Sequence, residues 1–205
     1  MKTLVIQSSI LGENSKSRQL VDHLLTRLTA SEPDIDVNTR DLGATALPYF
    51  DGATLGGLFT PADQRTAEQT AAVAQADALI AELFDAQRII LAVPVYNFGL
   101  PAQLKTYIDH IARAGVTFKY GADGVPVGLL TGKEVFVVSA RGGQAEGTPI
   151  DTVTPYLQTM LGFLGLNNIT FIAGEGQAMG PDAAAAGIEK ARNKIDALFA
   201  LATPA

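Results

Sequence analysis

The stretch RIILAVPVYNFGLP, residues 88–101, decides the fold class of this chain. Its first eight residues are almost continuously apolar, which is typical of a strand that is covered on both faces of a parallel sheet. The residues that follow bring two aromatic rings, an asparagine, a glycine and a second proline in place of a simple helix cap. The stretch therefore predicts a central strand, followed by a loop with a task of its own.

Four further strand-like runs extend this pattern along the chain. They are rich in β-branched residues and occupy residues 3–8, 35–42, 134–140 and 168–175. Helical patterns separate the strands, near residues 16–29, 61–85, 101–113, 152–164 and 182–200. Strands that alternate with helices form right-handed βαβ units, so the sequence predicts an α/β protein with helices on both faces of a five-stranded parallel sheet. No linker divides residues 1–205, which we expect to form one domain.

Local signals predict where some helices begin and end. Threonine–proline pairs at residues 60–61 and 154–155 predict an N-cap followed by proline at the first helical position. Gly165 follows an apolar run and predicts the end of a helix.

Two segments interrupt the plain alternation of strands and helices. Residues 43–60 contain four glycines and predict a long connection. Residues 115–131 predict a hairpin that turns at Asp123 and Gly124. Long ordered excursions are usually functional or part of an interface, so both segments are candidate walls of a binding site.

The composition excludes several classes of function. The formal charge is −6, without a basic cluster, which argues against nucleic acid and anionic membranes as partners. The absence of cysteine excludes disulfides and thiolate chemistry, and His23 and His110 lie too far apart in the sequence to suggest a metal site. No apolar run approaches a signal peptide or a membrane span, so we expect a cytoplasmic protein. Only 18% of residues are charged, which indicates a surface partly covered by a second copy of the chain.

Three loops follow strands that should end at the same rim of the sheet. In an open α/β sheet with the strand order 2-1-3-4-5, ligands bind at the carboxyl ends of the strands, where the order reverses between strands 1 and 3. The loops after the first, third and fourth strands therefore form the candidate site. No Ser–His–Asp set and no carboxylate pair lies in them, so we predict no catalytic side chain and no metal.

The first loop, SSILGENSKSRQL at residues 8–20, leads into a helix. Its hydroxyl groups and the backbone N–H groups at the helix start can bind a phosphate. For either Ser15 or Ser17 alone, a simple N-cap is the better interpretation, whereas the group as a whole favours phosphate. The spacing is not that of GxGxxG or GKS/T loops, which argues against NAD as a resident cofactor and against nucleotide hydrolysis.

The loops after the third and fourth strands contain aromatic side chains and accessible backbone N–H groups. Pro94 stiffens the third-strand loop and is counted with the ligand-binding residues, while Tyr96, Asn97 and Phe98 suit a flat heteroaromatic ligand with polar edges. An ordinary strand-to-helix turn is an equally good interpretation of that loop alone. The fourth-strand loop, SARGGQAEG at residues 139–147, lets backbone amides approach a ligand closely, or is simply a flexible turn.

With SSILGENSKS, PVYNFGLP and ARGG in this order and spacing, the chain resembles the FMN-dependent NADH-azoreductase family, also described as FMN-dependent NADH:quinone oxidoreductases. The likeness covers essentially the whole length and includes ARAGVTFKY at residues 112–120 and TPYLQTMLGFLG at residues 154–165. It implies a flavodoxin-like fold, a homodimer with one FMN per subunit, and active sites at the subunit interface.

The resemblance also implies roles for individual residues. The positions that match the family's phosphate loop are Ser9, Ser15, Lys16 and Ser17. Those along the flavin ring are Val95, Tyr96, Asn97 and Phe98, and those at its pyrimidine edge are Ala140, Arg141, Gly142 and Gly143. The substrate space is expected to be lined by Phe118, Tyr120 and Phe163. Val95, Gly99, Ala140 and residues 144–149 depart from common family patterns, which puts the substrate preference in question.

The resemblance implies that NADH reduces the bound FMN, which passes two electrons to quinones or azo compounds; nitroaromatics are flat, electron-poor acceptors of the same kind. Because donor and acceptor would need the same face of the flavin, we expect a ping-pong sequence. Because the cofactor carries that chemistry, the absence of an acid, base or nucleophile set is expected. Two other functions fit the same fold. A one-electron carrier would show a stable half-reduced state during dithionite titration, and a scaffold without cofactor would stay colourless with FMN.

Overall fold

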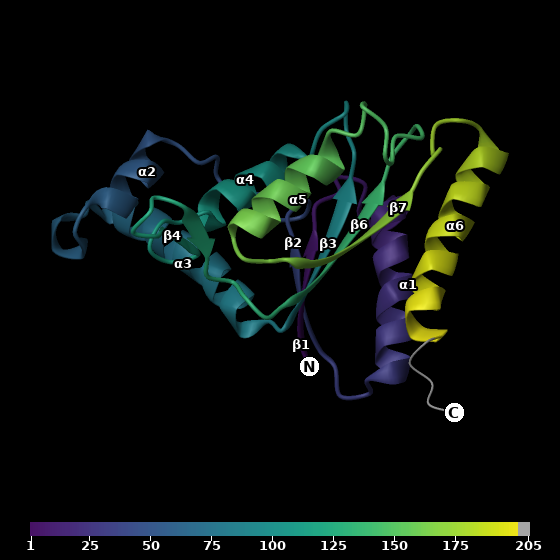
Figure 1. Cartoon of the computed structure of the whole chain (residues 1–205). Coiled ribbons are helices and arrows are strands. Elements are labelled where there is room, and N and C mark those ends of the chain that lie inside the picture. The colour runs from purple at the N-terminus through teal and green to yellow at the C-terminus, as the bar shows by residue number, and fades with distance from the viewer. Residues whose placement is uncertain (201–205) are drawn as a thin grey trace.

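The computed structural model describes residues 1–200, and the last five residues of the predicted domain lie outside the described part. A five-stranded parallel sheet crosses the middle of the molecule in the order β2–β1–β3–β6–β7 (Figure 1). Its strands are β1 (Lys2–Gln7), β2 (Asp36–Asp41), β3 (Arg88–Pro94), β6 (Glu134–Ala140) and β7 (Asn168–Gly174). Counted among the sheet strands alone, this is the predicted order 2-1-3-4-5.

Strand β3, the apolar run at residues 88–94, lies at the centre of the sheet. All seven residues of β3 are buried, because strands pair with both of its edges and helices cover both of its faces. Its side chains alternate between two apolar clusters, so that Ile89 and Leu91 face one layer and Ile90 and Ala92 face the other. The continuous apolar run therefore correctly predicted a doubly covered strand.

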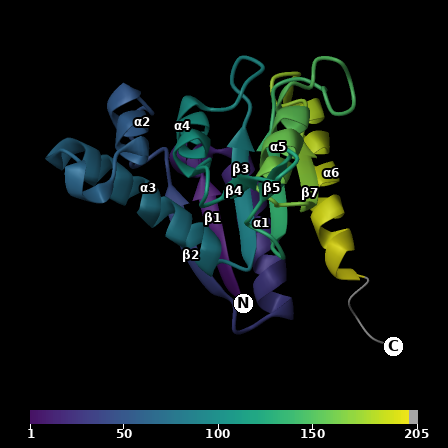
Figure 2. The ribbon, with the colours of Figure 1, turned by 60° about the vertical axis from the view of Figure 1, so that its left-hand side comes forward.

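Helices form a layer on each side of the sheet (Figure 1). The apolar stripes of α1 (Lys16–Ser31) and α6 (Pro181–Ala200) pack on one face. On the other face lie α3 (Ala67–Asp85), α4 (Ala102–Ile111) and α5 (Val153–Phe163). In the turned view α3 and α4 lie to the left of β3, and α6 lies to the right of β7 (Figure 2). No described helix combines the length and apolar character needed to cross a membrane.

The predicted helix at 61–85 begins later than expected. The threonine–proline pair at 60–61 does not start it, because Thr60 caps the C-terminus of a separate helix, α2 (Gly52–Phe59). A short 3-10 turn, η2 (Ala62–Gln64), follows, and α3 begins only after Thr66. Thr66 and Gln69 form a reciprocal capping box that satisfies two backbone N–H groups, which a lone threonine before proline does not do. The segment 43–60 therefore contains a helix, where we expected only a connection.

The start of α5 also differs from the prediction. The helix begins at Val153, so Pro155 is its third residue and Thr154 is not the cap. Asp151 accepts a hydrogen bond from the backbone N–H of Thr154 at 3.1 Å and takes the capping role. Proline is tolerated within a first helical turn, where no N–H partner exists. At the other end, the predicted stop at Gly165 is correct, since its φ of +95° is left-handed.

The predicted hairpin is present at residues 118–128. Strands β4 (Phe118–Tyr120) and β5 (Pro126–Gly128) pair in antiparallel fashion, and the chain turns through Gly124 with a φ of +77°. Gly128 lies so close to Gly165 that a Cβ on Gly128 would be 2.0 Å from the Gly165 nitrogen. This contact fixes the hairpin to the C-terminal end of α5.

Candidate active site

The three predicted loops meet at the carboxyl rim of the sheet, uppermost in Figure 1. The Tyr96 hydroxyl lies 3.1 Å from Ser9 Oγ and accepts the N–H of Ile10 at 3.3 Å, which joins the loops after β1 and β3. The N–H of Val95 donates to the carbonyl of Ala140 at 2.9 Å, which joins the loops after β3 and β6. These contacts confirm that the predicted loops are neighbours at the point where the strand order reverses.

The first loop delivers hydroxyl groups to the start of α1. A 3-10 turn, η1 (Gly12–Asn14), precedes Ser15, whose side chain caps the helix by accepting the N–H of Arg18 at 3.3 Å. Ser15 Oγ also lies 3.0 Å from Ser17 Oγ. The first-turn N–H groups of Lys16 and Ser17 have no intrahelical acceptor. The N-cap interpretation of Ser15 is therefore correct, and the same helix end remains suited to an anion.

The second loop is a tight turn with an unusual sequence. Tyr96 and Gly99 exchange two backbone hydrogen bonds, of 3.1 and 2.9 Å. Asn97 and Phe98 between them have φ values of 50° and 63°, so the turn is of type I′. Asparagine tolerates this conformation, but a phenylalanine there is strained. The Phe98 ring is nevertheless 70% exposed, and its carbonyl accepts a hydrogen bond from the Thr152 hydroxyl.

The backbone of the third loop points its N–H groups in one direction. The carbonyls of Arg141, Gly142 and Gly143 accept hydrogen bonds of 2.9–3.1 Å from the backbone of residues 176–178. In a planar trans peptide the N–H points away from the carbonyl of the preceding residue. The N–H groups of residues 142–144 therefore point away from 176–178, and none donates to an acceptor within the part of the chain that the structure describes. They are free donors, and two of these residues, Gly142 and Gly143, line a cavity at the rim of the sheet.

A cavity of about 300 Å³ lies between the second and third loops. Its walls come from the two turns and from the start of α5, and the lining residues are Val95, Asn97, Phe98, Arg141, Gly142, Gly143, Ala145, Ile150, Asp151, Thr152 and Val153. It is at the small end of the usual range for ligand pockets. A Cβ on Gly143 would meet nothing within 4 Å, so this wall is open. A flat ring with polar edges fits apolar walls that carry free N–H donors.

Residues 150–153 are part of this wall although the sequence reasoning missed them. A usable sequence signal was Asp151, three residues before Thr154 at a helix start. Burial tends to raise the pKa of Asp151, but hydrogen bonds from Thr154 and the charge of Arg141 outweigh it and hold the pKa below its ordinary value. Asp151 is therefore an ionised structural group and does not act as a proton donor at neutral pH.

The predicted substrate residues gather elsewhere in the chain. The rings of Phe118 and Phe163 have centroids 4.3 Å apart, and Tyr120 lies edge-on to Phe118 at 5.7 Å. Phe163 ends the 11-residue helix α5, whereas the cavity lies at its first residue, about 15 Å away along the axis. The aromatic cluster Phe118–Tyr120–Phe163 thus does not share the cavity of its own chain.

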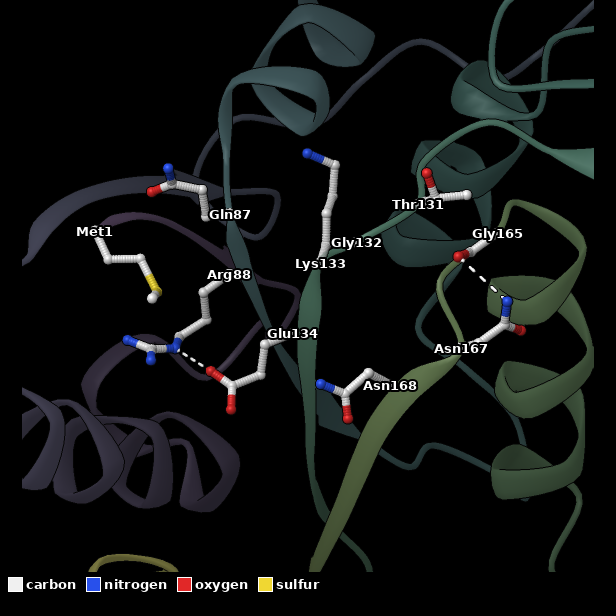
Figure 3. A pocket seen from close by; sticks show the side chains of 10 residues that line it. All are labelled: Met1, Gln87, Arg88, Thr131, Gly132, Lys133, Glu134, Gly165, Asn167 and Asn168. Atoms are coloured by element: carbon white, nitrogen blue, oxygen red, sulfur yellow. Dashed lines mark hydrogen bonds and ion pairs between the residues drawn. The ribbon is translucent and has the colours of Figure 1, made fainter. Parts of the chain in front are cut away.

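A second and larger cavity, of about 1020 Å³, lies at the opposite, amino end of the strands (Figure 3). Arg88 in its wall is almost fully buried and donates to Glu134 at 2.6 Å and to Glu32 at 2.7 Å. Its charge is therefore already neutralised by carboxylates. Ligands of open α/β sheets bind at the carboxyl ends, so the smaller cavity is the better candidate despite its size.

The histidines have structural surroundings. His23 bonds Asp196 at 2.9 Å on the helix layer formed by α1 and α6. His110 is buried, donates to the carbonyl of Pro48 at 2.9 Å and packs edge-on against Phe50. It is buried because the 43–60 segment folds over α4.

Comparison with known proteins now assigns the family. A family model described as a flavodoxin-like fold matches residues 1–199. The FMN-dependent NADH:quinone oxidoreductase of Bordetella petrii is 68% identical over 200 residues, which cover 98% of this chain and 96% of the relative. The chain belongs to this oxidoreductase family.

Other members of the quinone oxidoreductase family and solved structures agree. The FMN-dependent NADH:quinone oxidoreductase of Paraburkholderia phymatum is 54% identical over 194 residues, covering 95% of this chain and 98% of the relative. A crystal structure of an azoreductase from Bacillus anthracis has a TM-score of 0.88 and 30% identity, over 97% of this chain and 98% of that one. The resemblance and the fold class predicted from the sequence are confirmed.

Proposed function

We propose that this protein binds FMN and uses NADH to reduce quinones to hydroquinones and to cleave aromatic azo compounds. The observation that carries the proposal is the cavity between the turn at 96–99 and the loop with the free N–H groups of Gly142 and Gly143, at the switch point of a flavodoxin-like sheet. The names of the relatives at 50–68% identity support the same reaction. When bound, FMN would supply the chemistry by accepting a hydride and passing on two electrons.

The residues at the rim fit the parts of FMN. The phosphate would lie at the start of α1, held by the N–H groups of the first turn and by nearby hydroxyls; these residues are Ser9, Ser15, Lys16 and Ser17. The ring would lie in the cavity against Pro94, Val95, Tyr96, Asn97 and Phe98. The Tyr96 hydroxyl bonds Ser9, so the two halves of the site are held in fixed relation.

The third loop would stabilise negative charge at the pyrimidine edge of the ring. The free N–H groups of Gly142 and Gly143 are fixed before any ligand binds, because their neighbouring carbonyls are bound to residues 176–178. Donors fixed in advance lose little energy to reorganisation when charge develops. Asp151 is held in an ion pair with Arg141 at 3.0 Å, so it is not available as a base. The protein holds and polarises the cofactor, and no side chain acts as acid or base.

The active site is composite and is completed by a second copy of the chain. The aromatic cluster Phe118–Tyr120–Phe163 lies too far from the cavity of its own chain to contact a ligand there. Large apolar side chains are exposed on the same molecule, including Tyr49 at 76% and Phe59 at 79%. A homodimer would cover such surface and bring the partner's aromatic cluster over the flavin, where it would stack on quinones, azo compounds or nitroaromatics.

NADH and the electron acceptor would bind one after the other at the same site. The loops of its own chain would cover one side of a bound flavin ring and leave the other side open, so NADH and the acceptor would have to use the same side. NAD⁺ therefore leaves before the acceptor enters, which is a ping-pong sequence. Two further expectations, a single domain over residues 1–205 and a cytoplasmic location, stay predictions.

Steady-state kinetics test the proposal directly. The purified protein, loaded with FMN, is expected to oxidise NADH with a benzoquinone and with an azo dye, and initial-rate plots at several acceptor concentrations should give parallel lines. A preparation that stays colourless after incubation with FMN would contradict the proposal. So would FMN-loaded protein that oxidises no NADH with either acceptor, while a stable half-reduced state in dithionite titration would favour a one-electron carrier.

A further inference from the structure

Arg141 begins the loop at residues 142–150, and Asp151 ends it. Both side chains are only 5% exposed, and Arg141 Nη1 lies 3.0 Å from Asp151 Oδ1. Arg141 Nη2 donates to the hydroxyls of Ser139 and Thr154 at 3.4 and 3.3 Å. The guanidinium therefore directs most of its donors to the protein, at the base of the loop.

Glu175 holds the outer part of the same loop. Its Oε1 accepts the backbone N–H groups of Ala145 and Glu146, both at 2.8 Å, and lies 3.9 Å from Arg141 Nε. The Nε atom is buried and has no hydrogen-bond acceptor among the described residues. The guanidinium thus lies between two carboxylates, Asp151 at the end of the loop and Glu175, which binds backbone N–H groups in the middle of it.

We infer that Arg141 is a positioning residue whose side chain fixes the loop at residues 142–150 through Asp151, and that it does not act by direct contact with the flavin. This inference rests on the proposed FMN function and assigns the sequence-predicted cofactor residue Arg141 a different role. Most side chains of the loop are exposed, so few packing contacts hold its shape. The buried ion pair at its base joins the two ends of the loop, and hydrogen bonds between charged groups are stronger than those between neutral groups.

A double-mutant cycle on FMN binding separates positioning from direct contact. Apo-protein is titrated with FMN, and flavin fluorescence is followed for wild type, Arg141→Met, Asp151→Ala and the double variant. If the loop keeps its binding shape only about a tenth of the time without the pair, each single variant raises Kd about tenfold. The double variant should also raise Kd about tenfold, because the two side chains act through one interaction. Independent effects that multiply to about a hundredfold, or a wild-type Kd in Asp151→Ala, would overturn the inference.

The midpoint potential of the bound flavin gives a second readout. The double variant loses one positive and one negative charge, so a remaining shift reports the loop and its N–H donors. We expect a midpoint potential more negative than that of the wild type, because reduced flavin would be less well stabilised. If the double variant has the midpoint potential of the wild type, Arg141 acts by its charge alone, and the inference fails.

Two further variants serve as controls, one for the loss of any arginine–aspartate pair and one for misfolding of Arg141→Met. Arg113→Met removes another arginine–aspartate pair, with Asp77, whose residues line no part of the rim cavity, and it should change neither Kd nor potential. Arg141→Lys keeps the charge but cannot reach Asp151, Ser139 and Thr154 together, so it should still weaken FMN binding if Arg141→Met does not fold. Wild-type Kd in Arg141→Lys would contradict the inference.

The failure of the inference is distinguishable from the failure of the proposed function. If the wild-type protein binds no FMN, both fail. If the wild-type protein binds FMN but the effects of the two substitutions on Kd multiply, only the inference fails.

Discussion

At the scale of single residues, the turn at 96–99 departs most clearly from local preference. Asn97 and Phe98 both adopt left-handed backbone angles, and only the asparagine suits them. The Phe98 ring gains little from burial, since it is 70% exposed. Such strain persists where the surrounding structure enforces it and is frequent at binding sites. The sequence predicted a ligand loop here, but an asparagine–phenylalanine pair carries no usual signal for a type I′ turn.

Phe98→Gly is therefore expected to be more stable than Phe98→Ala by about 1 kcal/mol, because alanine keeps the Cβ strain that glycine removes. Both variants lose the exposed ring, so both should lower the rate of quinone reduction. Urea unfolding of the two apo-proteins measures the difference. Equal stabilities would show that the turn relaxes without strain in the alanine variant.

A second residue-scale prediction concerns acid stability at the amino edge of the sheet. The hydrogen bonds from Arg88 hold the pKa of Glu32 below its ordinary value, against the opposing effect of burial. The contribution of Glu32 is thus complete above its unfolded pKa of about 4.3 and is lost as pH falls through the lower folded pKa. Wild type should lose more unfolding free energy than Glu32→Gln between pH 7 and about pH 3. Parallel pH profiles in urea unfolding would contradict this prediction.

At the scale of elements, the strands were predictable and the helix starts were less so. All five sheet strands lie within a residue or two of their predicted bounds. For β1, β3 and β6 the reason is that continuous apolar runs are required where helices cover both faces, whereas the edge strand β2 is mostly exposed. The start of α3 was wrong because the capping box of Thr66 and Gln69 outweighs the proline signal at residue 61. The short helix α2 was missed because three of its eight residues are glycines, which oppose helix formation in a local reading.

The contact between Gly128 and Gly165 gives an element-scale prediction. Gly128→Ala would place a Cβ 2.0 Å from the Gly165 nitrogen, so the hairpin must move away from α5. We expect a loss of more than about 3 kcal/mol of unfolding free energy, or a detached hairpin with weakened acceptor turnover. Gly132→Ala is the matched control, since its φ is +73° but no atom lies within 4 Å of the added Cβ. It should cost only about 1 kcal/mol, and equal losses in the two variants would refute the role of close contact.

At the scale of the whole molecule, the sequence predicted which loops form the site at the carboxyl rim of the sheet, but it did not predict the cavity wall that other segments of the chain contribute. The loops after β1, β3 and β6 were predictable because parallel strands end at one edge. Residues 150–153 line the cavity only because of where α5 packs on the sheet, and this packing could not be predicted from a single sequence. The distance of the aromatic cluster Phe118–Tyr120–Phe163 from the cavity likewise follows from the direction of α5.

The composite site predicts complementation between two defective chains. Gly143→Asp places a carboxylate toward the cavity in open space, and a second chain carries Tyr120→Ala with Phe163→Ala. Each homodimer should be nearly inactive. Co-expressed in equal amounts, the chains should recover about a quarter of wild-type NADH:quinone activity, because half of the dimers are mixed and each has one intact site. No recovery in purified mixed dimers would place the complete site within one chain.

The long separation between paired strands also affects how the chain is made on the ribosome. Thr3 in β1 pairs with Arg88 in β3, so β1 cannot form this pairing until another 85 residues have been synthesised. At about 5–20 residues per second, translation of that interval takes roughly 4–17 s. During this time β1 can pair only with β2, and its other edge stays open to unrelated chains. Slowing synthesis before β3 should therefore increase aggregation of the nascent protein, whereas a chaperone that covers this edge should suppress it.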